Sequence, residues 1–167
     1  MAYCYRRYPV SQNEYTQKTG RLLAHRLWQQ FTEQGHNTWI CKGQNKGVDL
    51  KVLDCFGKEV IVAEVLNWSP KTNLSEKRKG NIIRNLLNYD CNKVLIYTAM
   101  GNEKNLAELR LLGISTLKIG YQILPKQFYW HFEAKNQVEG RKIDSRETTA
   151  HIKARVLEYL QLLRLKP

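Results

Sequence analysis

The sequence lacks the features that mark membrane-spanning or secreted disulfide-rich proteins. It has no apolar run of about 18 residues, the length a membrane helix needs, and no apolar signal segment near Met1. The four cysteines, Cys4, Cys41, Cys55 and Cys91, are far apart without a CxxC pair, and the four histidines lack metal-ligand spacing. These absences argue against a zinc ribbon, a redox motif and membrane insertion. We expect a cytoplasmic protein with reduced thiols.

Acidic residues are also scarce. The chain has 15 Asp+Glu against 27 Lys+Arg, a formal net charge of +12. Such an excess creates a long-range field that attracts polyanions, so the composition predicts nucleic acid as the partner class. Charge alone does not indicate an activity, because structural RNA-binding proteins have a similar balance.

Length and periodicity predict one domain, residues 1–167, because 167 residues of 43% hydrophobic content suffice for one ordinary core. Ser75 and Asn102 are predicted helix caps. The predicted elements, in order, are a helix over 17–33, a strand over 38–41, strands over 48–54 and 59–66, a helix over 75–89, a strand over 93–98, a helix over 102–112, strands over 114–119 and 121–132, and a helix over 146–165. This order predicts an α+β fold with a mixed sheet flanked by helices.

The strands over 48–54 and 59–66 form a predicted hairpin that carries two acidic residues. With the turn centred between Phe56 and Gly57, Asp49 lies opposite Glu64. Opposed like charges destabilise a sheet unless something neutralises them, and a hard cation such as Mg²⁺ binds carboxylates of this kind. A surface salt bridge from Lys51, diagonal to Glu64, is the alternative explanation.

These residues and the order of elements resemble the PD-(D/E)XK nuclease superfamily, most nearly its archaeal Holliday-junction resolvases. The resemblance covers about residues 17–120 and leaves 121–167 as a C-terminal extension. Gly47-Val48-Asp49-Leu50 is similar to the Asp motif, and Ala63-Glu64-Val65 is similar to the Glu motif. The resemblance implies a restriction-endonuclease-like fold, in which Asp49 and Glu64 bind Mg²⁺ or Mn²⁺ and act in phosphodiester hydrolysis.

Two positions depart from the family's pattern. Leu66 occupies the position of the motif lysine, and Ala24 stands where the first helix is expected to present Glu. A lysine from elsewhere is then needed to orient water and offset charge on the phosphate. Lys77, near the start of the helix over 75–89, is our preferred catalytic substitute, with Lys51 and Lys79 as alternatives.

The helix over 75–89 contributes two further features. Asn85 and Tyr89 resemble a Gln-x-x-x-Tyr element of some relatives, although Tyr89 also suits ordinary packing. Basic residues on and near this helix are expected to contact DNA phosphates, unless they form only a solvated surface. The predicted nucleic-acid-binding residues are Lys51, Lys71, Lys77, Arg78, Lys79 and Arg84.

Three functional hypotheses remain open from the sequence. The first is a metal-dependent endonuclease acting on branched or modified DNA, as the resemblance implies. The second is an inactive nucleic-acid-binding or assembly module of the same fold, which Leu66 and Ala24 favour. The third is a basic RNA-associated protein of another mixed fold. A homodimer is expected under the first hypothesis, because a two-fold protein can address two strands.

Overall fold

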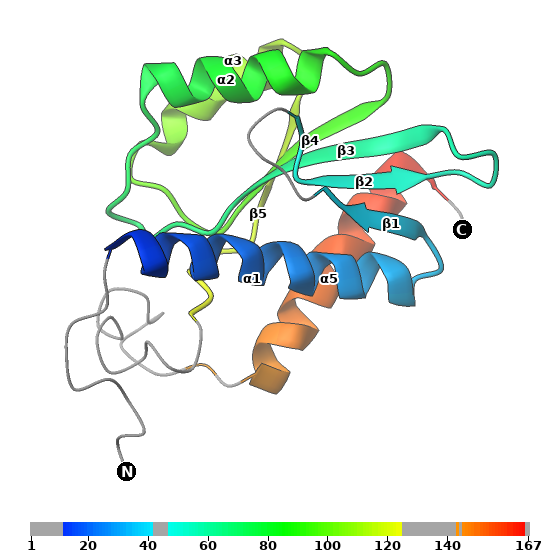
Figure 1. Ribbon diagram of the computed structural model, residues 1–167, viewed down its shortest axis with the longest axis horizontal. Coiled ribbons are helices and arrows are strands. Elements are labelled where there is room, and N and C mark those ends of the chain that lie inside the picture. Colours follow the sequence, from blue (N-terminus) through cyan, green and yellow to red (C-terminus); the bar gives the residue numbers. More distant parts are fainter. Residues whose placement is uncertain (1–11, 42–46, 125–142, 144, 166–167) are drawn as a thin grey trace.

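The computed structural model describes residues 12–41, 47–124, 143 and 145–165. They form a five-stranded mixed sheet flanked by helices (Figure 1), so the predicted fold class is confirmed, and the order of elements matches the prediction as far as the strand over 114–119. The elements are α1 (Gln12–Glu33), β1 (Asn37–Ile40), β2 (Leu50–Leu53), β3 (Glu59–Leu66), α2 (Glu76–Leu87), β4 (Asn92–Tyr97), the 3₁₀ helix η1 (Glu103–Leu106), α3 (Ala107–Leu111), β5 (Ser115–Lys118) and α5 (Ser145–Leu163).

The strands lie in the sheet in their order along the chain. β1, β2 and β3 are antiparallel neighbours, whereas β3, β4 and β5 are parallel. Parallel neighbours need a crossover connection, and α2 and the η1–α3 segment supply the two crossovers. β4 is covered on both faces, as its nearly continuous apolar sequence predicts, and Val94, Leu95 and Ile96 are fully buried.

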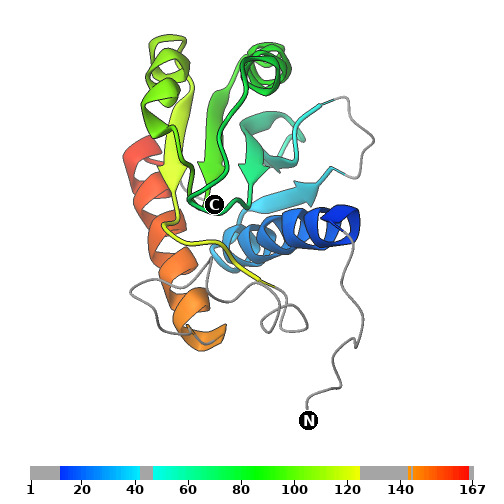
Figure 2. The same ribbon diagram turned by 90° about the vertical axis from the view of Figure 1, so that its left-hand side faces the viewer.

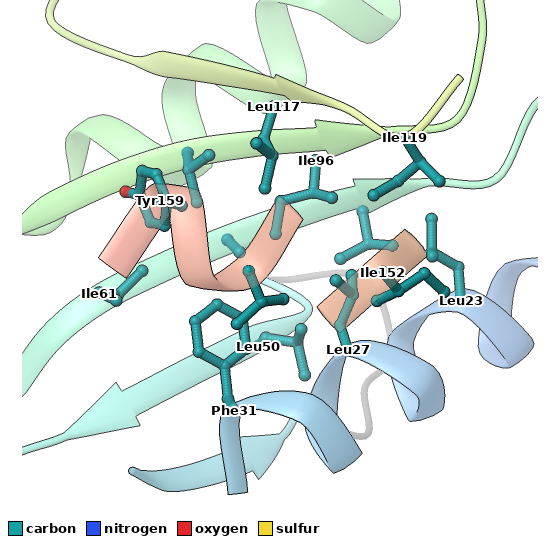
Figure 3. Close-up of a cluster of buried hydrophobic side chains, with 14 of the residues drawn as sticks. Leu23, Leu27, Phe31, Leu50, Ile61, Ile96, Leu117, Ile119, Ile152 and Tyr159 are labelled. Atoms are coloured by element: carbon teal, nitrogen blue, oxygen red, sulfur yellow. The ribbon is translucent and has the colours of Figure 1, made fainter. Parts of the chain in front are cut away.

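Helices cover both faces of the sheet (Figure 2). α2 and α3 lie on one face, and α1 and α5 lie on the other. On the α1–α5 face, the helical stripe of Leu23, Leu27 and Phe31 packs with Leu50 and Ile152 (Figure 3). On the α2–α3 face a second apolar cluster forms, whose members are Val48, Val62, Leu66, Leu74, Ile82, Leu86, Leu95, Tyr97, Met100, Leu106, Leu109 and Ile114. The central strands therefore separate two hydrophobic cores.

One predicted helix cap is confirmed and the other is wrong. The hydroxyl of Ser75 accepts a hydrogen bond from the backbone N–H of Arg78, three residues into α2. Asn102 makes no such bond at η1. Its side-chain amide instead bonds both backbone groups of Leu74, at 2.7 and 2.9 Å, because the loop before α2 lies beside it. Asn102 therefore joins two loops.

The segment after β5 is anchored to the end of β3. The amide of Asn67 donates to the carbonyl of Ile123 at 2.8 Å and accepts from its N–H at 2.9 Å. Gln122 donates back to the Asn67 carbonyl at 2.8 Å. Of the strand predicted over 121–132, residues 121–124 are not in a strand, and 125–132 lie outside the described residues. None of the described helices is long and apolar enough to span a bilayer.

Candidate functional site

The β2–β3 hairpin has the register expected from the sequence beside its acidic residues. Leu50 pairs with Ala63 and Lys51 with Val62, so Asp49 directly precedes β2 at the level of Glu64. A bulge after Val52 shifts the pairing only on the turn side, where Gly57 adopts a φ of 80°. The register that brings the two acidic residues together is therefore intact.

The two carboxyl groups form one hydrogen-bonded unit. The side chain of Asp49 shares a hydrogen bond with the side chain of Glu64. Oδ2 of Asp49 also accepts from the backbone N–H of Val65 at 2.7 Å, which fixes the carboxyl against β3. Glu64 is only 4% exposed. This geometry predicts that one proton lies between the carboxyls.

Burial dominates the electrostatics of the pair. It raises the pKa of Asp49, and the Val65 N–H opposes that rise by stabilising the carboxylate. Burial, reinforced by the charge of Asp49, raises the pKa of Glu64 to about 8. Near neutral pH the Glu64 carboxyl therefore retains its proton, and the two carboxyls titrate as one coupled pair.

The groups that act on this pair from outside the hairpin come from α2. Nδ2 of Asn85 donates to Oε1 of Glu64 at 3.0 Å. The positive charge of Arg78 lowers the pKa of both carboxyls and so favours their ionised forms. Arg78 and Asn85 are seven residues apart, which places them on one face of a helix. Asp49, Glu64, Asn85 and Arg78 are called the acidic site below.

The part of α1 whose side chains are described, residues 20–33, does not supply a comparable partner. The Leu23 stripe of α1 packs on the sheet face opposite to the acidic site, against Leu50 and Ile61. Ala24 is buried at 7% exposure, and His25 beside it is exposed. Among the described residues, the helical side chains that act on Asp49 and Glu64 therefore come from α2.

The lysines considered from the sequence have three different environments. Lys77 is exposed on α2 and is not among the groups that shift the pKa values of the pair. Lys79 is 7% exposed and its ammonium pairs with Glu108 at 2.6 Å and Glu76 at 3.1 Å. Lys79 thus connects α2 with α3, and we no longer include it in the expected DNA surface.

Lys51 does not form the predicted alternative salt bridge. Its ammonium lies 3.7 Å from Glu59 and 5.1 Å from the centre of the Tyr89 ring, rather than beside Glu64. The remaining predicted phosphate contacts, Lys71 and Arg84, are exposed, and Arg84 donates to Asn81 at 3.1 Å. Four exposed cations on and just before α2 are called the α2 basic surface: Lys71, Lys77, Arg78 and Arg84.

The position of the missing motif lysine is filled by packing. Leu66 is 2% exposed and belongs to the cluster between the sheet and α2. Asn67, the next residue, is buried and holds the 122–123 segment, so its amide is fully engaged. Both side chains are uncharged and have contacts elsewhere, so neither residue supplies the missing cation to the acidic site.

The acidic site offers oxygen ligands suited to a hard cation. Mg²⁺ commonly uses one or two carboxylates and completes its octahedron with water and phosphate oxygens. Asp49 and Glu64 could supply these carboxylates. No cluster of three or more His, Cys, Asp or Glu that could hold a metal occurs within residues 20–41, 47–124 and 145–165. The two carboxylates of Asp49 and Glu64 thus suit a cation that also binds a phosphate, rather than a structural metal held by protein ligands alone.

Sequence reasoning identified Asp49 and Glu64 but did not predict the contact of Glu64 with Asn85. The signal for Asn85 was its spacing from Tyr89, which indicated a family element but no particular partner. Arg78 was predicted to bind phosphate, whereas its influence on the carboxyls depends on how α2 packs over the sheet. No family model, curated protein or solved structure matches this chain. The site is therefore interpreted from its own geometry.

Proposed function

We propose that this chain is a DNA-binding protein of PD-(D/E)XK nuclease type that cleaves phosphodiesters in branched or modified DNA with Mg²⁺ or Mn²⁺. The observation that carries the proposal is the pair of hydrogen-bonded carboxyls formed by the half-buried Asp49 and the buried Glu64. The net charge of +12 and the α2 basic surface support DNA as the substrate.

A purely structural role explains the pair poorly. Placing two carboxyl groups side by side, away from bulk water, is unfavourable unless they share a proton or a cation, and an apolar pair would avoid that cost. The lysine that a surface salt bridge would require, Lys51, pairs with Glu59 instead. Binding a divalent cation is a function that makes use of both carboxyls.

Each residue of the acidic site has a proposed role. Asp49 and Glu64 hold the cation, and the Asn85 amide keeps the Glu64 carboxyl oriented. A divalent cation bound there would polarise a phosphoryl oxygen and lower the pKa of water. Arg78 stabilises charge that develops on the phosphate, the task of the absent motif lysine. Arg78 thus replaces Lys77 as our preferred cation.

Calorimetric titration tests the metal directly. We expect Mn²⁺ and Mg²⁺ to bind the native protein, and to bind more tightly at pH 8.5 than at pH 6.5 because the shared proton must leave. Asp49→Asn/Glu64→Gln should abolish binding, whereas Asp90→Asn, an exposed carboxylate beyond α2, should leave binding unchanged. Equal binding by the native and the doubly substituted protein would refute the metal site.

Cleavage assays test the activity. Metal-dependent cleavage of branched or nicked DNA is expected, with Asp49→Asn lowering kcat by about 100-fold or more. Arg78→Ala should lower kcat with little change in KM, while Lys77→Ala, a change one residue away, should have a much smaller effect on kcat. If Lys77→Ala caused the larger loss, our original preference for Lys77 would be restored.

The alternative is an inactive nucleic-acid-binding or assembly module of the same fold. The buried Leu66 at the motif position favours this alternative. Salt-dependent DNA binding without cleavage of branched, nicked or single-stranded substrates, with either metal, would support the module.

The proposal also includes a homodimer in the cytoplasm. Cys41, Cys55 and Cys91 are free thiols in the described residues, as is usual in a reducing compartment. A two-fold dimer would place two acidic sites against two strands of one branched substrate. Sedimentation equilibrium at micromolar concentration tests the dimer, and a monomer with full activity would refute it.

A further inference from the structure

Trp39 is an exposed aromatic residue on the face of the sheet that carries the acidic site. It lies in β1 directly opposite Lys51 of β2, and opposed residues share a face. Its side chain is 59% exposed. The adjacent Thr38 is buried and its carbonyl accepts from the indole of Trp28 in α1, so the other face of β1 is the one that α1 covers.

The position of Trp39 relative to Asp49 follows from the strand register. Asp49 lies two residues before Lys51, which makes it the diagonal neighbour of Trp39 across β1 and β2. Such neighbours are about 7–8 Å apart, which corresponds to about two base steps of 3.4 Å along a stacked strand. An aromatic ring is thus within a short reach of the acidic site.

The indole is held in place while most of its side chain stays exposed. Nε1 of Trp39 donates to Oδ1 of Asn37, two residues earlier in β1, at 3.0 Å. Trp39 thus presents a flat aromatic surface to solvent in a defined orientation. Fixing the indole before binding reduces the entropy that a ligand would otherwise lose.

The charge around Trp39 matches a nucleic-acid strand. Lys51 is the directly opposed side chain, and the net charge of the chain is +12. Proteins bind single-stranded nucleic acid by combining cations for the phosphates with exposed aromatic rings for the bases. A base inside a continuous duplex cannot stack on a protein ring, because its neighbours already cover both of its faces.

From this arrangement we propose that Trp39 stacks on an unpaired base of the DNA whose backbone lies at the acidic site. The inference rests on the proposed function and narrows its substrate to DNA with a single-stranded segment next to the scissile phosphate, such as a flap, a fork or an open junction. Lys51 exchanges its surface ion pair with Glu59, of a kind that contributes little to stability, for a phosphate of that segment. Continuous duplex DNA binds through the α2 basic surface without engaging Trp39.

Binding of oligo(dT) and of a blunt duplex, measured in EDTA, tests this inference apart from any cleavage. Trp39→Ala should weaken oligo(dT) binding about tenfold, the usual effect of losing one stacked base, and should change duplex affinity less than twofold. Trp39→Phe should retain most of the affinity. Phe56→Ala is the matched control, because Phe56 is 90% exposed in the hairpin turn, at the end of β2 remote from Asp49.

Each outcome separates this inference from the proposed function. Equal losses of oligo(dT) and duplex affinity in Trp39→Ala, or no loss of either, would overturn the stacking role. Metal-dependent cleavage that Asp49→Asn abolishes would still support the nuclease in that case. A selective loss of oligo(dT) binding in a protein without cleavage would support stacking within a binding module. If Trp39→Ala changed the oligomeric state instead of DNA affinity, Trp39 would be an interface residue and the inference would be wrong.

Discussion

Asp49 and Glu64 together make the acidic site sensitive to pH even without a metal. Burial raises the pKa of both carboxyls, and the pair retains a proton under conditions in which exposed carboxyls are ionised. Folding therefore stabilises the protonated form of the pair. It follows that this site makes the protein less stable as the solution becomes alkaline.

Glu64→Gln should remove most of this pH dependence. Because the pKa of Glu64 rises on folding from its ordinary 4.5 to about 8, its contribution is fully present below pH 4.5 and is lost as pH increases to about 8. The variant should raise the free energy of unfolding at pH 9 by about 2–4 kcal/mol and change it little at pH 5. Urea denaturation at both pH values measures this effect.

The control for this prediction is Glu33→Gln, which alters an exposed carboxylate at the end of α1. Its free energy of unfolding should stay close to that of the native protein at both pH values. The difference in the free energy of unfolding between the native protein and Glu64→Gln should change from pH 5 to pH 9. An equal difference at both pH values would contradict the raised pKa of Glu64.

Restoring the motif lysine at Leu66 should fail for a reason of packing. Leu66 is 2% exposed among apolar side chains between β3 and α2, and a lysine there would lose its hydration. Leu66→Lys should lower the free energy of unfolding by about 2–5 kcal/mol, whereas Leu66→Met should cost less than about 1.5 kcal/mol. Thermal denaturation compares the two, and a Leu66→Lys protein as stable as Leu66→Met would show that the position is accessible.

At the scale of elements, α2 combines three tasks along its length. Ser75 caps the helix, and Lys79 holds it to α3 through Glu108. Asn85 contacts the acidic site from the later turns. The basic residues of α2 therefore differ in role although they are neighbours in sequence.

Lys77→Met and Lys79→Met should separate binding from stability. Lys79→Met removes the ion pairs with Glu76 and Glu108 and should lower the melting temperature without changing the salt dependence of DNA binding. Lys77→Met should leave the melting temperature unchanged and reduce the slope of log K against log salt by about 0.9, the value for one phosphate contact. Calorimetry measures the melting temperature, and salt titrations measure the slope. If Lys79→Met reduced the slope and Lys77→Met lowered the melting temperature, Lys79 would belong to the DNA surface.

Local patterns were enough to predict some of these elements but not their partners. Ile152, Val156 and Leu160 recur four residues apart, as on one face of a helix, and all three are buried in α5; the turn at Gly57 predicted the pairing near Leu50. Such features depend on neighbouring residues, which the sequence displays directly.

Features that depend on distant packing were missed or misassigned. Asn102 has the sequence features of a helix cap but bonds Leu74, because a loop distant in sequence lies beside it. Lys79 belongs to a basic run, but its acidic partner Glu108 is on α3. The contact of Asn85 with Glu64 likewise requires the crossing of α2 over β3. These contacts form only when separate elements pack together.

At the scale of the whole molecule, the sheet depends on the C-terminal helix. Four side chains of α5 are buried in the same cluster as Leu23 of α1: Ile152, Val156, Tyr159 and Leu160. Burying an aliphatic side chain contributes about 1.5–3 kcal/mol, so the helix provides a large part of a typical stability of about 5–15 kcal/mol. The α5 helix is therefore integral to folding.

Ending the chain after Leu124 should abolish cooperative unfolding. The truncated protein would expose Leu23 and its neighbours, and its thermal transition, followed by circular dichroism, should broaden or disappear. Val156→Asp should have a similar effect, because Val156 is fully buried, whereas Leu162→Asp on the same helix should be tolerated at 74% exposure. A sharp transition in the truncated protein would show that residues 1–124 fold independently.

The hairpin register also has a kinetic consequence. Asp49 and Glu64 are brought together by β2 and β3, a local pairing of the kind that forms early in folding. Repulsion between their carboxylates would then oppose an early step rather than the final packing. Stopped-flow refolding should become slower as the pH rises from about 4.5 towards 8, and Glu64→Gln should refold at a rate independent of pH over this range. If pH changed only the unfolding rate, the contact between the two carboxyls would form after the folding transition state.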